Sequence, residues 1–195
     1  MMVIRPDSRS MQLSDTSCFL HPGDWLYSAE AMTLKTVLGS CVAVIIWHGK
    51  TQSGGMCHFV LPEVPTGSMQ HRPAGYYGDS AVKLLITETK KLNAHPGEFR
   101  VGVYGAICRS GDESGALSRN IGKRNVEMAK KLLAQNGFVI AEKIVSEPVG
   151  YLSVSLNLRD GHVDVKSGPL TDSNQNENYT PIGDIGVKSC RPFAS

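Results

Sequence analysis

The sequence predicts an α/β (α+β) layered sandwich, with mixed β-sheets and two main helices in one domain. Short runs of apolar and β-branched residues are separated by Gly, Pro, Asn and Asp, as expected for strands joined by turns. Two longer segments repeat their apolar residues at helical spacing instead. Several strands with two helices inserted between them favour layers of helix and sheet around a shared core.

The expected strands are short, and each ends at a Gly, a Pro or a polar cluster. They cover residues 36–38, 42–47, 56–61, 100–107, 138–145, 152–158 and 162–165. The last two are joined by Asp160-Gly161, a dipeptide typical of hairpin turns.

The first expected helix begins with Asp79 as its N-cap, and its apolar stripe continues to Leu92. A Gly- and Ser-rich loop then leads to a second helix, expected around residues 124–136. Gly137 is well placed to end that helix.

The length of 195 residues suits one domain with loose ends. Residues 1–19 are mixed and polar, and we interpret them as an N-terminal extension. The tail at residues 168–195 is rich in Asn, Ser, Gly and Pro and is expected to be mostly irregular. The predicted domain therefore spans residues 20–167.

Composition excludes several classes of function. Hydrophobic residues make up 41% and charged residues 19%, which indicates a globular chain. The net charge of +2 is small and the basic residues are scattered, which argues against nucleic acid as a partner. The longest apolar run, residues 41–47, is too short for membrane insertion, and the N-terminus lacks the apolar core of a signal peptide. The five cysteines form no CxxC pair, so a cytoplasmic protein with free thiols is expected.

Cys41 has features suited to a nucleophile. It follows Gly39-Ser40, where the backbone can turn sharply and leave N–H groups free to hold an oxyanion, and it precedes an apolar strand. His58 lies on the next expected strand and, in the right register, would meet Cys41 as its base.

Structural explanations compete with this hypothesis. A cysteine in an apolar run is most often a small core residue, and a histidine beside apolar residues is most often structural. Cys57 should point to the opposite face from His58 and belong to the core. Cys18, Cys108 and Cys190 have no chemical neighbours in the sequence. The His and Cys spacings do not match metal-ligand patterns, so neither a metal nor a cofactor is expected.

Two motifs at these residues are similar to the signature of the chemoreceptor glutamine deamidases, the CheD family. They read LGSCVAV at residues 38–44 and GGMCHFVLP at residues 54–62. The resemblance continues at residues 21–24, 77–81 and 120–125, and it covers about residues 20–167.

The resemblance implies a catalytic pair of Cys41 and His58 on a layered fold related to bacterial toxin deamidases. The implied substrates are glutamines in the cytoplasmic helices of methyl-accepting chemotaxis receptors, which are converted to glutamates with release of ammonia. The resemblance also implies the chemotaxis phosphatase CheC as a partner.

The chain departs from the family pattern before the cysteine. Family members commonly place a threonine six residues earlier to orient the histidine, and here that position is Lys35. On a regular strand Lys35 shares a face with Cys41, while Thr36 points away. Either a bulge brings Thr36 into place or a backbone carbonyl orients His58, and we assign Thr36 as the third catalytic residue.

Two later stretches, residues 104–108 and 147–152, also depart from the family pattern, which bears on receptor or partner recognition. They leave two other functions open. One is a non-catalytic adaptor that binds chemoreceptors or CheC, and the other is a thiol hydrolase acting on a small amide. The presence of both Cys41 and His58 favours catalysis, because binding alone requires neither.

Overall fold

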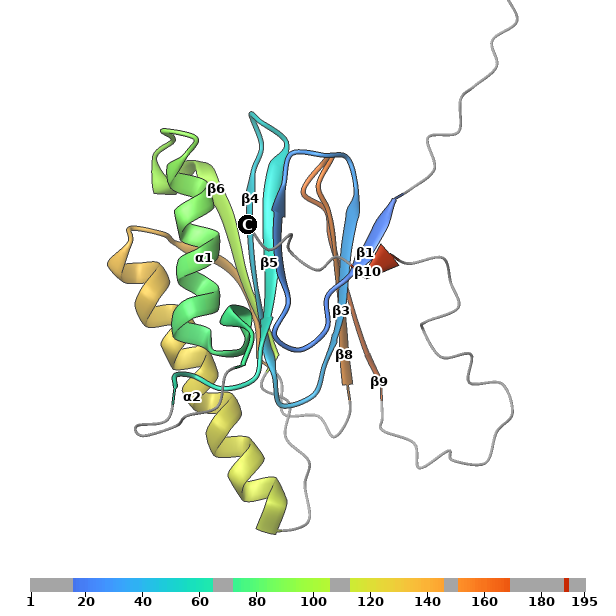
Figure 1. Ribbon diagram of the computed structural model, residues 1–195, viewed down its shortest axis with the longest axis vertical. Coiled ribbons are helices and arrows are strands. Elements are labelled where there is room, and N and C mark those ends of the chain that lie inside the picture. Colours follow the sequence, from blue (N-terminus) through green and yellow to red (C-terminus); the bar gives the residue numbers. More distant parts are fainter. Residues whose placement is uncertain (1–15, 65–71, 106–112, 146–150, 169–187, 190–195) are drawn as a thin grey trace, which may run out of the picture.

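The computed structural model describes residues 16–64, 72–105, 113–145, 151–168 and 188–189. Figure 1 shows two β-sheets lying face to face, with a layer of helices against one of them. The elements in chain order are β1 (Ser17–Phe19), β2 (Trp25–Ser28), β3 (Thr33–Leu38), β4 (Val42–His48), β5 (Ser53–Phe59), η1 (Ala74–Tyr76), α1 (Gly78–Lys90), η2 (Pro96–Glu98), β6 (Phe99–Gly105), α2 (Glu113–Gln135), β7 (Ile140–Val145), β8 (Tyr151–Asn157), β9 (Val163–Gly168) and β10 (Lys188–Ser189).

Each sheet has five strands. Sheet A has the order β10-β1-β3-β8-β9, and sheet B has the order β2-β5-β4-β6-β7. Both sheets mix parallel and antiparallel pairs: β3 is parallel to β1 and antiparallel to β8, while β6 is antiparallel to β4 and parallel to β7. The chain therefore passes from sheet A to sheet B between β3 and β4, through residues 39–41.

The two sheets and the helices enclose two hydrophobic cores. Helices α1 and α2 cover the face of sheet B that points away from sheet A (Figure 1). The helix-side core lies between these helices and sheet B and includes Val44, Leu85 and Leu133. The inter-sheet core lies between sheets A and B and includes Ile45 and Leu156. The expected layered sandwich with two main helices is confirmed.

Alternation along β4 and β5 decides which core each side chain enters. On β4, residues 42, 44 and 46 belong to the helix-side core, while residues 43 and 45 belong to the inter-sheet core. On β5, residues 57 and 59 lie on the helix side, and Met56 lies on the inter-sheet side. The near-continuous apolar run of β4 follows from this burial on both faces.

Several boundaries differ from the sequence prediction. Helix α2 begins at Glu113, not around residue 124, so the Gly- and Ser-containing segment is helical despite its weak helix preference. Asp79 is not the N-cap of α1: Tyr77 holds that position, and the Asp79 carboxylate accepts a hydrogen bond from the Ser80 backbone N–H. Gly137 does end α2, with φ at +79°, and Gly161 makes the expected β8–β9 turn, with φ at +71°.

The chain contains short strands that the sequence did not predict. Strand β2 is one of them, and β1 and β10 lie within the stretches interpreted as extension and tail. The domain boundaries at residues 20 and 167 stay a prediction. Within the described part of the chain, no helix is both long and apolar enough to cross a membrane.

Candidate active site

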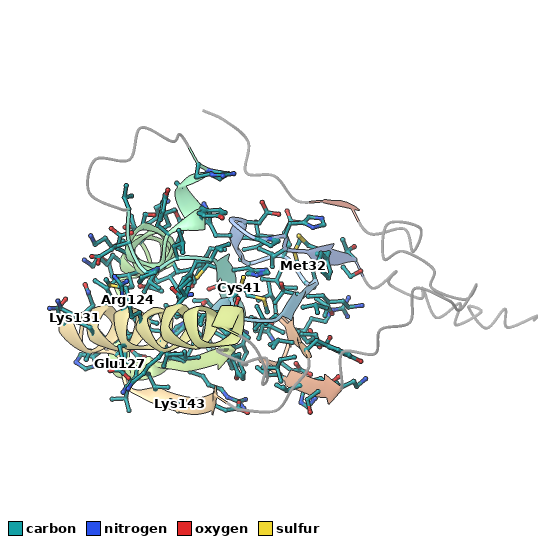
Figure 2. The ribbon with its side chains drawn as sticks, turned by 90° about the horizontal axis from the view of Figure 1, so that it is seen from below. Met32, Cys41, Arg124, Glu127, Lys131 and Lys143 are labelled. Carbon is teal, nitrogen blue, oxygen red and sulfur yellow. The ribbon has the colours of Figure 1, made fainter. Side chains whose placement is uncertain are left out.

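Cys41 lies where the chain passes from one sheet to the other. Gly39 and Ser40 form a bend after β3, and β4 starts at Val42, directly after the cysteine. The Cys41 side chain is partly buried and packs against the inter-sheet core. In Figure 2, which shows the molecule from below, Cys41 is seen between α2 and the strands where Met32 is labelled.

His58 enters the same space from β5. It pairs with Ala43 in the antiparallel β4–β5 ladder, and its side chain is only 2% exposed. His58 lies two residues after Met56 on β5, so its side chain points to the inter-sheet core as that of Met56 does. Cys41 borders the same core, as does Ala43. Cys41 directly precedes Val42, which pairs with Phe59, and it borders the inter-sheet core, so Cys41 and His58 lie on the same side of sheet B. The assignment of Cys41 and His58 as a catalytic pair stays a prediction.

Thr36 reaches His58 from the opposite sheet. It lies on β3, fully buried, and its Oγ1 is 2.8 Å from Nδ1 of His58. The same hydroxyl donates to the backbone carbonyl of Leu20 at 2.8 Å. That carbonyl is also 3.3 Å from Nδ1 of His58. One threonine from sheet A thus holds the ring of a histidine from sheet B.

These contacts determine the tautomer of His58. The Leu20 carbonyl has no proton to give, and the Thr36 hydroxyl proton is used in the bond to that carbonyl. Nδ1 must therefore carry the ring proton and donate it, which leaves Nε2 as an unprotonated acceptor. Nε2 is buried and has no hydrogen-bond partner among the residues that the structure describes. A ring held at one nitrogen and free at the other is arranged to accept a proton.

The electrostatics favour a neutral resting pair. Burial lowers the pKa of His58 from 6.5 to about 4, and the Leu20 carbonyl and the Asp24 carboxylate act in the opposite direction. Burial also raises the pKa of the Cys41 thiol. The structure has no hydrogen bond between Cys41 and the free Nε2 of His58. Proton transfer from thiol to ring would therefore accompany substrate binding, when such contacts tighten.

The expectation that Lys35 shares a face with Cys41 is wrong. Along β3, Leu34, Thr36 and Leu38 are buried, while Lys35 is exposed on the outer face of sheet A. Side chains alternate between the two faces only within one continuous strand. Here the chain bends at residues 39–40 and enters the other sheet, so the alternation does not carry from Lys35 to Cys41. The bend, and not a bulge within β3, brings Thr36 to His58.

The remaining cysteines differ from Cys41 in their surroundings. Cys57 is fully buried in the helix-side core, as expected, and burial raises the pKa of its thiol to about 12. Cys18 is buried in the inter-sheet core. Cys108 and Cys190 lie outside the described residues. Cys41 is thus the most accessible of the three described thiols.

The sequence did not single out the backbone that surrounds His58. The Gly23 N–H donates to the His58 carbonyl at 2.7 Å, and the His58 N–H donates to the Asp24 carbonyl at 2.9 Å. The signal in the sequence was His21-Pro22-Gly23-Asp24, which reads as a turn but does not indicate what the turn contacts. Leu20 contributes only its carbonyl, and a backbone atom leaves no signature in the residue type.

A cysteine before β4, a histidine on β5 and a threonine on β3, all on the inter-sheet side, are residue types from which thiol-dependent hydrolase sites are built. The family model described as CheD chemotactic sensory transduction matches residues 60–167, more than half of the chain. This match begins just after His58. Alignments with individual relatives cover about three quarters of the chain.

One relative is the probable chemoreceptor glutamine deamidase CheD 1 of Chromobacterium violaceum. It is 31% identical over 145 residues, which are 74% of this chain and 72% of the relative. A second is the probable chemoreceptor glutamine deamidase CheD of Pseudomonas syringae pv. syringae, 32% identical over 154 residues, which are 77% of this chain and 84% of the relative. The chain belongs to the CheD family.

Among solved structures, the chain is similar to the hypothetical protein YfiH of Bacillus licheniformis. The TM-score is 0.41 at 16% sequence identity, and the similarity covers 64% of this chain and 51% of the other. A likeness of this size does not bear on function.

Proposed function

We propose that this protein is a cysteine-dependent protein-glutamine deamidase that converts glutamines of chemotaxis receptors to glutamates. The observation that carries the proposal is the buried Thr36–His58 hydrogen bond, which leaves Nε2 of His58 without a partner among the described residues, on the side of sheet B that Cys41 borders. Membership of the CheD family supports the reaction, because the relatives described above are named chemoreceptor glutamine deamidases.

In the proposed first half-reaction, Nε2 of His58 takes the proton from Sγ of Cys41. The thiolate attacks the carbonyl carbon of the glutamine side chain, forming a C–S bond and moving an electron pair onto oxygen. When the tetrahedral intermediate collapses, the C–N bond breaks and His58 returns its proton to the leaving nitrogen. Ammonia departs and a thioester remains on Cys41.

In the second half-reaction, water attacks the thioester carbon while His58 accepts one of its protons. The C–S bond breaks, the thiolate of Cys41 takes back the proton held by His58, and the glutamic acid formed releases its remaining proton to solvent as it becomes the γ-carboxylate. Thr36 keeps the ring in one tautomer through both halves, because its Oγ1 can only accept from Nδ1 while it donates to Leu20. The cycle needs no cofactor.

We assign the oxyanion site to the backbone at Gly39, Ser40 and Cys41. The bend precedes the nucleophile directly, and a methyl group at Gly39 would meet no atom within 4 Å, so the chain is uncrowded there. An N–H donor of this kind typically lowers the barrier by about 3 kcal/mol. Receptor helices as substrates, CheC as a partner and a cytoplasmic location are further parts of the proposal and depend on the family resemblance.

The test is ammonia release together with the amide-to-acid mass change on purified cytoplasmic fragments of a chemoreceptor. Native protein and Cys57→Ala should convert glutamines, Cys41→Ala should not, and His58→Ala should be slower by about 10²–10⁴-fold. Cys57→Ala is the matched control, because it removes a thiol that is next to His58 in the sequence but on the opposite face of β5.

Receptor binding without conversion by the native protein would favour the adaptor. Conversion of free glutamine in preference to receptor glutamine would favour a small-amide hydrolase. Conversion that survives Cys41→Ala would exclude the proposed mechanism.

A further inference from the structure

The turn at residues 21–24 forms a hydrogen-bonded support for His58. Both backbone groups of His58 are bonded to it, through Gly23 N–H at 2.7 Å and the Asp24 carbonyl at 2.9 Å. The turn closes on itself by a bond from Asp24 N–H to the His21 carbonyl at 2.9 Å. Gly23 has φ at +96°, a conformation that favours glycine. The catalytic ring is thus positioned from its backbone as well as from Nδ1.

The Asp24 carboxylate is fixed on this turn. Its Oδ2 accepts a hydrogen bond from the His21 backbone N–H at 2.9 Å. An asparagine could make the same bond through its amide oxygen, because the acceptor needs no charge. The turn therefore does not explain why the residue is acidic, and the negative charge needs another explanation.

The proposed reaction creates a positive charge that the ring's bonded partners do not balance. The groups bonded to Nδ1 are a hydroxyl and a carbonyl, both neutral, and the ring is buried. The titratable groups that act on His58 are Asp24 and His21, both on the turn, whereas Lys35 on β3 is exposed on the outer face of sheet A. Of these, Asp24 is the one carboxylate.

We propose that Asp24 is a positioning residue whose negative charge stabilises the protonated ring of His58 while its backbone holds that ring in place. The inference depends on the proposed function in one respect only, that His58 becomes protonated when Cys41 loses its proton. The effects on the pKa of His58 agree with this proposal. Burial lowers that pKa, the Asp24 carboxylate raises it, and His21 lowers it.

Asp24→Asn separates the charge from the geometry, because it keeps the acceptor for His21 N–H and removes the charge. A partly exposed carboxylate changes a neighbouring pKa by a few tenths of a unit to about one unit. The fraction of thiolate–imidazolium pair falls by the same factor, since it depends on the difference between the two pKa values. The variant should therefore react about 2- to 10-fold more slowly at Cys41, with an unchanged unfolding midpoint.

The experiment measures alkylation of Cys41 by iodoacetamide between pH 5 and pH 9, with the modified cysteine identified by peptide mapping, together with kcat and KM on receptor fragments. Glu30→Gln is the matched control, because it removes an exposed carboxylate a few residues away. We expect Asp24→Asn to lower the alkylation rate and kcat while KM stays constant, and Glu30→Gln to change neither. In a His58→Ala background, Asp24→Asn should have no effect on alkylation.

Four results would overturn the proposal: an unchanged alkylation rate in Asp24→Asn, an equal loss in Glu30→Gln, an equal loss in the His58→Ala background, or failure of Asp24→Asn to fold. Salt provides a second measurement. Added salt screens the Asp24 carboxylate, so it should reduce the difference in alkylation rate between native protein and Asp24→Asn. Alkylation does not require turnover. A native protein that fails to deamidate but shows the Asp24 effect would refute the proposed function and retain this inference.

Discussion

Thr36→Val tests whether the contact between the two sheets positions the catalytic base. Valine has nearly the shape of threonine but lacks Oγ1, so the change removes the acceptor for Nδ1–H of His58 and the donor to the Leu20 carbonyl. Both bonds are 2.8 Å long and buried. Leaving the Leu20 carbonyl without its short partner should cost about 1–3 kcal/mol of folding stability.

The effect on catalysis follows from the longer contact that remains. Nδ1 lies 3.3 Å from the Leu20 carbonyl, so the ring would keep a weaker acceptor and its tautomer while losing its orientation. We expect kcat to fall by about 10- to 100-fold, which corresponds to about 1.4–2.7 kcal/mol in the barrier. KM should change little, because Thr36 is fully buried.

The assay is steady-state glutamine conversion on receptor fragments, combined with unfolding in denaturant. Thr36→Ser keeps the hydroxyl and should retain most of the activity. Thr33→Val makes the same chemical change at the start of the same strand, three residues from the contact with His58, and should leave kcat unchanged. A Thr36→Val protein with native kcat, or a Thr36→Ser protein as slow as Thr36→Val, would refute the reasoning.

Three other predictions concern the same region. Burial holds the pKa of His58 at about 4 against 6.5 in the unfolded chain, so its contribution to stability is present above pH 6.5 and is lost as pH falls toward 4. Native protein should lose about 3 kcal/mol over that window in denaturant unfolding, and His58→Leu should lose correspondingly less; equal losses would contradict the assigned burial. Cys57→Ala should keep turnover and leave alkylation at Cys41 unchanged, because a buried thiol with a pKa of about 12 does not form thiolate at neutral pH. Gly105→Ala should lower kcat by about 10²-fold, because at φ +125° its methyl group would lie 2.3 Å from the carbonyl oxygen of Cys41. Gly161→Ala, whose methyl group would lie nearest to the Trp47 ring, should lower the unfolding midpoint without changing kcat, and equal loss of kcat in both would refute the claim for Gly105.

Periodicity predicted the layers and one face of the site. The expected strands at residues 42–47 and 56–61 exist with small shifts as β4 and β5, and alternation within β5 correctly separated Cys57 from His58. Short-range patterns carry this information because neighbouring strands joined by a tight turn have a register that the turn fixes.

The third member of the site could not be derived from the same rule. Thr36 and His58 lie in different sheets, and their contact depends on how the chain bends at residues 39–40. Counting along one strand placed Lys35 on the wrong side, because face parity is lost where a chain leaves its sheet. The start of α2 was missed because Gly and Ser residues before residue 124 indicate a loop by local preference, whereas the structure is helical there.

The measurement that tests the central claim most directly is detection of the thioester on Cys41. Native protein mixed with a receptor fragment and quenched in acid should show a covalent adduct of protein and fragment by mass spectrometry. Digestion should locate this adduct at Cys41 on one side and at a receptor glutamine on the other, and Cys41→Ala should show none. Glutamine conversion by native protein with no adduct at any quench time, or with the adduct on another cysteine, would contradict Cys41 as the nucleophile.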